Sequence, residues 1–131
     1  KLNRNFRPLK KDITLHTSCH SRAQNVGPKS AQILSLIPGI KTMNVEKCSG
    51  HGGTWGVKKK WNKTARKVGL TAAKKLYKDD NILTSTCPLA ALHFKDINEE
   101  KKISDTSISK EIYHPIELIA RAYNNGETKV E

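Results

Sequence analysis

The 131-residue chain is poor in aromatic residues, acidic residues and cysteine. Aromatic side chains make up 5% of the sequence, so a single-stranded nucleic acid would find few stacking partners. The chain has 12 acidic residues and 24 lysines and arginines, which gives a net charge of +12. No run of about 20 apolar residues is present, so no membrane-spanning helix is predicted.

Positive charge is concentrated in the first 95 residues, which hold 19 of the 24 basic residues and four of the 12 acidic residues. The densest block, residues 58–78, contains no acidic residue. Such a surface attracts nucleic acid, anionic lipid or an acidic protein through the same long-range field. The charge alone leaves these three partners open, together with a helix face that is only solvated.

Strands and helices are predicted to alternate along the chain. Short apolar runs predict strands at 12–16, 41–45 and 81–86. Helical patterns and proline positions predict helices at 28–37, 57–78 and 115–123. The charged stretch 96–110 has no periodicity and is predicted to be a loop. The order β-α-β-α-β-α favours a small three-layer α/β fold with a parallel sheet.

The long predicted helix carries an apolar stripe at steps of three and four residues. We expect this stripe to face the core and the lysines to face solvent. Gly69 interrupts the helix at a cost of about 1 kcal/mol relative to alanine, so a bend or close packing is expected there. The stripe consists of Val57, Trp61, Ala65, Val68, Ala72 and Leu76.

Each of the three cysteines follows a predicted strand: Cys19, Cys48 and Cys87. The carboxyl ends of neighbouring parallel strands share one edge of a sheet, where ligands bind, so three thiols can converge there. Three independent buried cysteines are the alternative interpretation. A disulfide framework is not expected, because the cysteine count is odd.

Imidazoles and glycines lie beside these cysteines in the sequence. His20 follows Cys19, and His51 lies in the turn Gly50-His51-Gly52-Gly53 after Cys48. Thiolate and imidazole suit an iron–sulfur cluster with one non-cysteine ligand, and they equally suit a tetrahedral zinc site. Gly50 and Gly52 would let the backbone approach the bound group and direct N–H groups at its sulfurs. Of the other histidines, His16 belongs to the same edge, and His93 and His114 are expected to serve structure.

Four blocks of sequence together resemble the cysteine-rich CCG domain. They are CHSRAQ at 19–24, LIPG at 36–39, CSGHGGTWGVKK at 48–59 and CPLA at 87–90. That domain occurs in one of the subunits of heterodisulfide reductase, in one of those of anaerobic glycerol-3-phosphate dehydrogenase and in related iron–sulfur oxidoreductases. The resemblance covers about residues 12–125, and residues 114–123 resemble the end of the same polypeptides.

The chain departs from the family pattern at two cysteines. Ser49 stands in place of the second cysteine of Cys-Cys-Gly, and Ala90 stands in place of the last cysteine of Cys-x-x-Cys. The three cysteines that remain resemble a rubrerythrin-associated branch of the family. Residues 12–131 are expected to form the cysteine-rich domain, and residues 1–11 a basic segment that continues from an upstream domain.

This resemblance implies an iron–sulfur electron-transfer module without a catalytic residue of its own. The implied cofactor is a [4Fe–4S] cluster, with zinc as the alternative. The implied partner is a redox protein, either a flavoprotein dehydrogenase or a rubrerythrin-like protein. The implied location is cytoplasmic, with a peripheral contact to the inner face of the membrane or to quinone. The implied metal ligands are Cys19, Cys48, Cys87 and His51, and the further cofactor-binding residues are His20, Gly50 and Gly52.

Two alternatives stay open beside this interpretation. A zinc-binding structural or protein-interaction module would use the same three cysteines and one histidine. A basic nucleic-acid-binding domain would use the lysines and keep the cysteines for packing, although the small number of aromatic residues makes it the less expected of the two.

Overall fold

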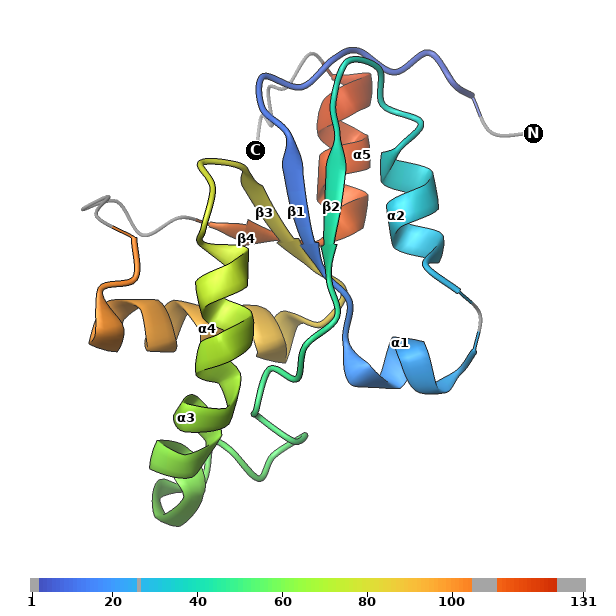
Figure 1. Cartoon of the computed structure of the whole chain (residues 1–131). Helices are drawn as coiled ribbons and strands as arrows, with labels where there is room; N and C mark the ends of the chain where they lie inside the picture. The colour runs from blue at the N-terminus through green and yellow to red at the C-terminus, as the bar shows by residue number, and fades with distance from the viewer. Residues whose placement is uncertain (1–2, 26, 105–110, 125–131) are drawn as a thin grey trace.

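The computed structural model describes residues 3–25, 27–104 and 111–124. None of the helices in these ranges is both long enough and apolar enough to cross a membrane. Figure 1 shows the elements in chain order. They are β1 (Ile13–His16), α1 (Cys19–Ala23), α2 (Lys29–Leu34), β2 (Thr42–Val45), α3 (Lys59–Leu76), β3 (Ile82–Ser85), α4 (Pro88–Lys101), β4 (Ile112–Tyr113) and α5 (Pro115–Tyr123).

The described strands form a four-stranded parallel sheet in the order β2-β1-β3-β4. At the end of β1, His16 lies opposite Val45 of β2 and Ser85 of β3. The expected α/β class with a parallel sheet is confirmed. The strands β1, β2 and β3 lie within the three predicted strand ranges. The short strand β4 and the helices α1 and α4 were not predicted.

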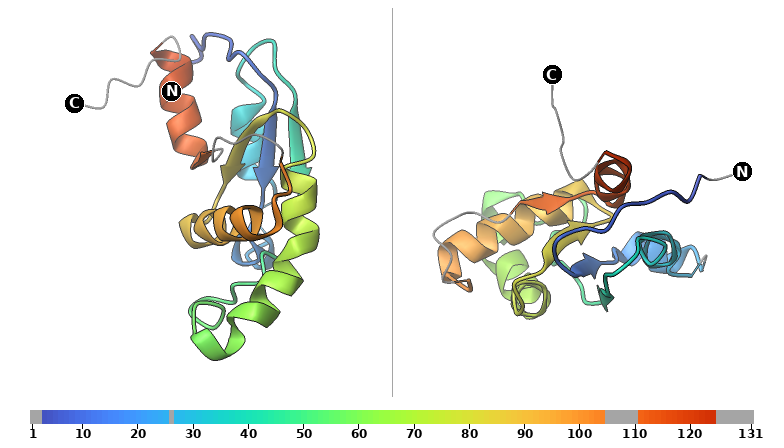
Figure 2. Two further views of the ribbon diagram at one scale, coloured as in Figure 1. Left: turned by 90° about the vertical axis from the view of Figure 1, so that its left-hand side faces the viewer. Right: turned by 90° about the horizontal axis from the view of Figure 1, so that it is seen from above.

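Helices cover both faces of the sheet, as Figure 2 shows. Ile13 and Leu15 of β1 pack with residues of α2 and α5, whereas Leu83 of β3 packs with residues of α3 and α4. Alternate residues of a strand point to opposite faces, so the two faces build two separate cores. Phe6 is buried in the first core, where its ring lies 4.7 Å from that of Tyr123. The expected three layers are confirmed.

The helix α4 corrects the predicted loop at 96–110, because residues 96–101 are helical. Pro88 occupies the first turn, where its missing N–H is no loss. Phe94 and Ile97 are buried against α3. The charged residues Asp96 and Glu100 of this helix contact Arg66 of α3. The local sequence pattern does not reveal a contact with a distant helix. Residues 105–110 of the predicted loop lie outside the described residues.

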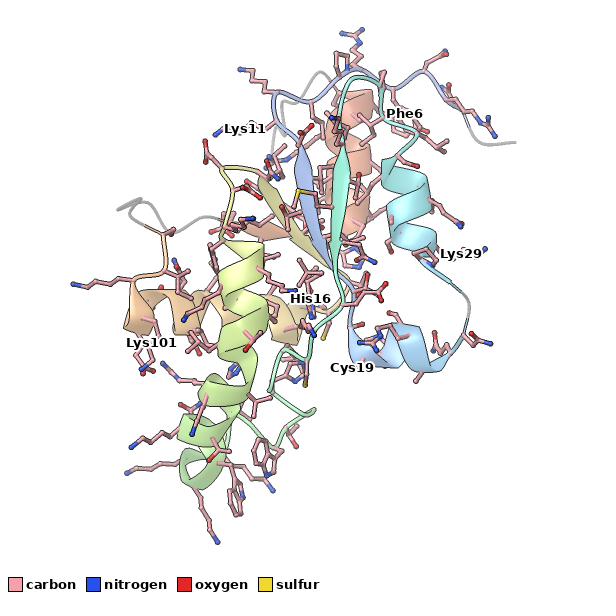
Figure 3. The ribbon with its side chains drawn as sticks, viewed as in Figure 1. Phe6, Lys11, His16, Cys19, Lys29 and Lys101 are labelled. Atoms are coloured by element: carbon pink, nitrogen blue, oxygen red, sulfur yellow. The ribbon has the colours of Figure 1, made fainter. Side chains whose placement is uncertain are left out.

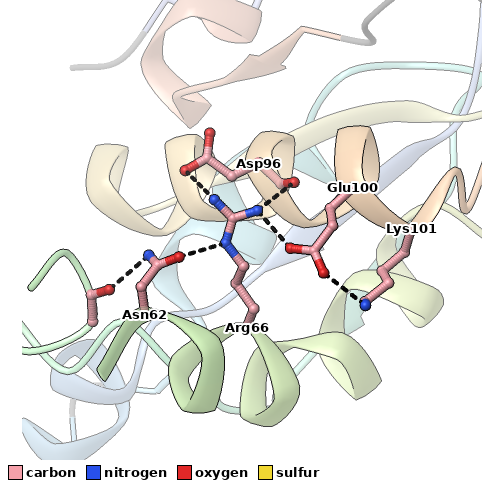
Figure 4. Close-up of polar contacts among 6 residues, drawn as sticks. Asn62, Arg66, Asp96, Glu100 and Lys101 are labelled. Atoms are coloured by element: carbon pink, nitrogen blue, oxygen red, sulfur yellow. Dashed lines mark hydrogen bonds and ion pairs between the residues drawn. The ribbon is translucent and has the colours of Figure 1, made fainter. Parts of the chain in front are cut away.

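Arg66 of α3 makes the polar contacts that join the two helices (Figure 4). Its guanidinium lies 2.7 Å from Glu100 Oε2 and 3.8 Å from Asp96 Oδ2. Its Nε donates to Asn62, which in turn donates to the carbonyl of Gly56 at 2.9 Å. Hydrogen bonds from Lys101 and Arg66 lower the pKa of Glu100 below its usual value. The network therefore fixes the start of α3 and the loop before it.

The apolar stripe predicted for α3 is only partly buried. Ala65, Ala72 and Leu76 are fully buried, so the expectation is confirmed for them. It is wrong for Val57, Trp61 and Val68, which are 65%, 38% and 48% exposed. With 18 residues α3 is about 27 Å long, whereas a four-residue strand spans about 13 Å. The first turns of α3 therefore lie beyond the sheet (Figure 1).

Two glycines allow the loop after β2 to lie against α3. A Cβ on Gly69 would stand 2.2 Å from the carbonyl oxygen of Ser49 and 2.7 Å from Cδ1 of Ile97. A Cβ on Gly50 would stand 2.2 Å from the carbonyl oxygen of Ala65, and Gly50 has a φ of +86°. The close packing expected at Gly69 is confirmed, and it holds the loop that carries Cys48.

The substitution Gly69→Ala is expected to destabilise the fold, although alanine is the better helix former. The added methyl would collide with the Ser49 carbonyl, and such overpacking typically costs about 1–3 kcal/mol. Urea unfolding followed by circular dichroism measures the change. Thr71→Ala, at an exposed position of the same helix, is the matched control and should change the free energy of unfolding by less than about 0.5 kcal/mol. Equal effects of the two substitutions would contradict the close packing.

Candidate metal centre

The three cysteines follow the carboxyl ends of three adjacent strands. Cys19 lies three residues beyond His16, Cys48 three residues beyond Val45, and Cys87 two residues beyond Ser85, and these three strand residues are paired across the sheet. The chain passes from β1 to β2 on one side and then to β3 on the other. The loops after β1 and β3 therefore diverge at this edge, which is where open α/β sheets bind ligands.

Cys19 and Cys48 form the first pair of this site. Both residues are exposed, and the Cys48 thiol neighbours that of Cys19 closely enough to affect its pKa. Desolvation of its sulfur and the neighbouring Cys48 thiol raise the pKa of Cys19 above its ordinary value. The N–H of Gly50 points at Cys48 Sγ from 3.4 Å. Two thiolates side by side repel each other, so a cation bound between them would be stabilised by both.

Cys87 and His51 form the second pair. Cys87 Sγ lies 3.7 Å from His51 Nε2, and both residues are half-buried. The other ring nitrogen, Nδ1, lies 3.1 Å from the carbonyl oxygen of Gly53. A carbonyl only accepts, so Nδ1 donates to it and a neutral ring keeps its Nε2 lone pair towards the thiol. That orientation of a histidine by a backbone carbonyl is common among metal ligands.

His16 ends β1 and is completely buried, and Figure 3 shows it near Cys19 at this end of the sheet. Its Nε2 lies 3.0 Å from the carbonyl oxygen of Lys47, next to Cys48, and its Nδ1 lies 3.1 Å from Ser85 Oγ. Ser85 Oγ is in turn 3.3 Å from the backbone nitrogen of Cys87. One ring thus connects the loop of Cys48 to the loop of Cys87. Burial lowers the pKa of His16, so the ring is neutral and donates only from Nε2.

Further hydrogen bonds tie the loop of Cys19 to its neighbours. Thr86, beside Cys87, donates from its hydroxyl to Ser18 Oγ at 2.9 Å and accepts the Ser18 N–H at 3.1 Å. Arg22 of α1 donates to the carbonyl of Glu46 at 3.0 Å, in the loop before Cys48. All three cysteine loops are therefore joined to one another by polar contacts.

The remaining histidines and Gly52 stand in different surroundings. His20 is exposed, with Nε2 3.4 Å from Ser18 Oγ. His93 is buried, its ring centroid lies 6.4 Å from that of His51, and its Nε2 has no partner among the described residues. Burial lowers the pKa of His93. His114 accepts the N–H of Ile116 and caps α5. Gly52 is exposed, with a φ of +53°.

The cysteine sulfurs and the His51 nitrogen are donors that suit an iron–sulfur cluster or zinc, although they are arranged as two pairs. In the part of the chain that the structure describes, no three cysteine, histidine or acidic side chains form a metal-binding group. The ligand set of three cysteines and His51 therefore stays a prediction. The sequence pattern did not reveal His16 as the link between the loops; the one available signal was a polar residue at a core position of a predicted strand.

The depressed pKa of His16 predicts an acid-sensitive fold. Because the folded pKa is lowered, protons bind the unfolded chain more strongly, so the stabilising contribution is complete above pH 6.5 and is lost as the pH falls below it. Each pKa unit of depression corresponds to about 1.4 kcal/mol. His16→Gln keeps a donor for Lys47 but cannot titrate, so its free energy of unfolding should depend less on pH.

Urea unfolding above and below pH 6.5 checks this prediction. His93→Gln is the companion variant and should also flatten the pH dependence, because burial lowers the pKa of His93 as well. If His16→Gln keeps the full pH dependence of the unsubstituted chain, the buried ring is not the cause.

Two known proteins are similar to this chain. It is 31% identical over 125 residues to one of the subunits of the fumarate reductase (CoM/CoB) of Methanothermobacter marburgensis, and the match covers 92% of the chain and 24% of that polypeptide. It is 32% identical over 111 residues to an uncharacterised iron–sulfur protein of Methanocaldococcus jannaschii, and this match covers 82% of the chain and 22% of that protein. No family model and no solved structure matches the chain.

The chain thus spans about a quarter of the length of either relative. The resemblance to the CCG domain in particular stays a prediction. One relative is named as part of an oxidoreductase and the other as an iron–sulfur protein, so the similarities of this chain are consistent with a family of iron–sulfur oxidoreductases.

Proposed function

We propose that this chain holds an iron–sulfur cluster and carries electrons within an oxidoreductase complex. The observation that supports this most directly is the position of Cys19, Cys48 and Cys87 just beyond the carboxyl ends of three adjacent parallel strands. The two similar proteins support the same chemistry, since one is named as an iron–sulfur protein and the other as part of a reductase.

In this proposal the three cysteines are thiolate ligands, and His51 is the fourth ligand through the lone pair of Nε2. A bound cluster would accept and release single electrons. The N–H of Gly50 stabilises negative charge on Cys48 Sγ, and such hydrogen bonds to sulfur tune a reduction potential. Gly52 and His20 would line the exposed side. The proposed cluster type is [4Fe–4S], in a polypeptide resembling the cysteine-rich subunits of heterodisulfide reductase or anaerobic glycerol-3-phosphate dehydrogenase.

The exposure of the thiols is consistent with electron exchange with another protein. Cys19 and Cys48 are exposed, so a bound group would lie near the surface. We infer that the redox partner is another member of the complex, either a flavoprotein dehydrogenase or a rubrerythrin-like protein. A partner with an acidic surface would be attracted by the net charge of +12.

Zinc is the second candidate for the same residues. The contact between Cys87 and His51 is the kind that a site with three cysteines and one histidine contains. A zinc site would make the chain a structural or protein-interaction module, with no electron transfer. The metal content of the purified protein distinguishes the two.

The full-length protein, purified without oxygen, is expected to be brown and to contain iron and acid-labile sulfide. Cys48→Ala and Cys87→Ala should each lower the affinity for iron about tenfold or more, and with it the iron content, because even the loss of a residue that only supports a ligand costs about ten- to hundredfold in metal affinity. Iron, zinc and sulfide analysis with visible absorption spectroscopy measures this.

Thr54→Ala is the matched control, because Thr54 is exposed in the same loop as Cys48 and carries no sulfur. It should leave the iron content unchanged. Colourless protein with one zinc per chain would establish the zinc site instead. Unchanged iron content in both cysteine variants would show that the proposed ligand set is wrong.

A further inference from the structure

Two tryptophans lie at the start of α3 and in the loop before it: Trp61 is exposed and Trp55 is half-buried. The rings of Trp55 and Trp61 are stacked, with centroids 5.7 Å apart and planes inclined by 20°. Trp61 is 38% exposed, and the neighbouring Val57 is 65% exposed. Lys60 Nζ lies 4.8 Å from the centre of the Trp61 ring. We call Trp55, Val57 and Trp61 the tryptophan platform.

Lysines surround this platform, and the stretch of sequence that contains both has no acidic residue. From residue 47 to residue 78 the chain has no acidic residue. Arg66, which lies in the same stretch, is bound to Glu100 and Asp96 of α4. The lysines around the platform are exposed, and none has an ion pair with another described residue: Lys58, Lys59, Lys60, Lys63 and Lys67.

We propose that the tryptophan platform docks onto an anionic membrane surface. Tryptophan prefers the boundary between headgroups and acyl chains, and lysines beside it bind anionic headgroups. Each lysine close to such a surface strengthens binding about fivefold. A protein interface is the less fitting occupant, because protein interfaces are enriched in arginine and depleted in lysine, and the one arginine here already has acidic partners.

The platform lies next to the candidate metal centre in the chain. A Cβ on Gly52 would stand 3.7 Å from the side chain of Trp55, and Gly52 follows His51 directly. A membrane bound at the platform would therefore lie close to the loop that carries Cys48. The orientation of a cluster towards the membrane rests on the proposed function, whereas the binding itself does not.

Tryptophan fluorescence gives a specific test, because Trp55 and Trp61 are the only tryptophans of the chain. The 131-residue chain is mixed with vesicles of phosphatidylcholine alone, or of equal parts phosphatidylcholine and phosphatidylglycerol. We expect a blue shift of the emission and co-sedimentation with the anionic vesicles only, and both should weaken as salt is added. Absence of both effects with anionic vesicles would overturn the proposal.

Two pairs of lysine substitutions on the same helix provide a matched comparison. Lys60→Gln with Lys63→Gln, at the platform, should lower binding to the anionic vesicles by roughly tenfold or more. Lys74→Gln with Lys75→Gln removes the same charge near the other end of α3 and should change binding by less than about threefold, since those lysines lie away from the bound surface. Equal losses of vesicle binding in the two double variants would show that the attraction depends only on net charge, and would overturn the docking site.

Trp61→Ala, followed by sedimentation, tests the aromatic contribution and should lower vesicle binding while the iron content stays constant. If the unsubstituted protein contains iron and fails to bind vesicles, this inference is refuted and the proposed function stands. A blue shift with single-stranded DNA and none with anionic vesicles would assign the platform to nucleic acid instead. A blue shift with an acidic protein and none with vesicles would assign it to a protein partner.

Discussion

The hydrogen bonds of the buried His16 ring are the contacts on which the candidate site depends. A neutral imidazole offers one donor and one acceptor, and here the donor holds the loop of Cys48 while the acceptor holds Ser85 before Cys87. Phe94 packs edge-on against the same ring at 4.8 Å, so the ring has one orientation. This ring therefore joins the loop of Cys48 to the loop of Cys87 from inside the fold.

Close backbone packing also holds the loop that carries Cys48 in place. The loop after β2 lies so near to α3 that neither Gly50 nor Gly69 has room for a side chain. Asn62 then holds Gly56, at the end of the same loop, and Arg66 connects that contact to α4. The candidate centre therefore consists of exposed and half-buried donors whose support is buried, and such rigid support keeps ligands within the narrow geometry that a metal group needs.

Much of the fold follows from local sequence, whereas the support of the site does not. The strands near 13–16, 42–45 and 82–85 are apolar enough to be recognised, and their order implies a shared edge for the cysteines. The helix α4 was missed altogether, and its charged second half was predicted to be a loop because Asp96 and Glu100 are stabilised by Arg66, thirty or more residues away. The role of His16 was hidden for the same reason: its partners are 31 and 69 residues distant.

The exposure of part of the apolar stripe on α3 originates in the short length of the sheet. A periodic stripe shows which face of a helix is apolar, but burial also requires a surface to cover it, and the four-residue strands end before α3 does. Ala65 is still covered by the loop after β2, while Val57, Trp61 and Val68 are left exposed. Acidic residues of α4 reach Arg66, whereas the lysines of the first turns have no acidic partner among the described residues. Apolar surface and positive charge thus remain together beside the cysteine loop, because the sheet is short.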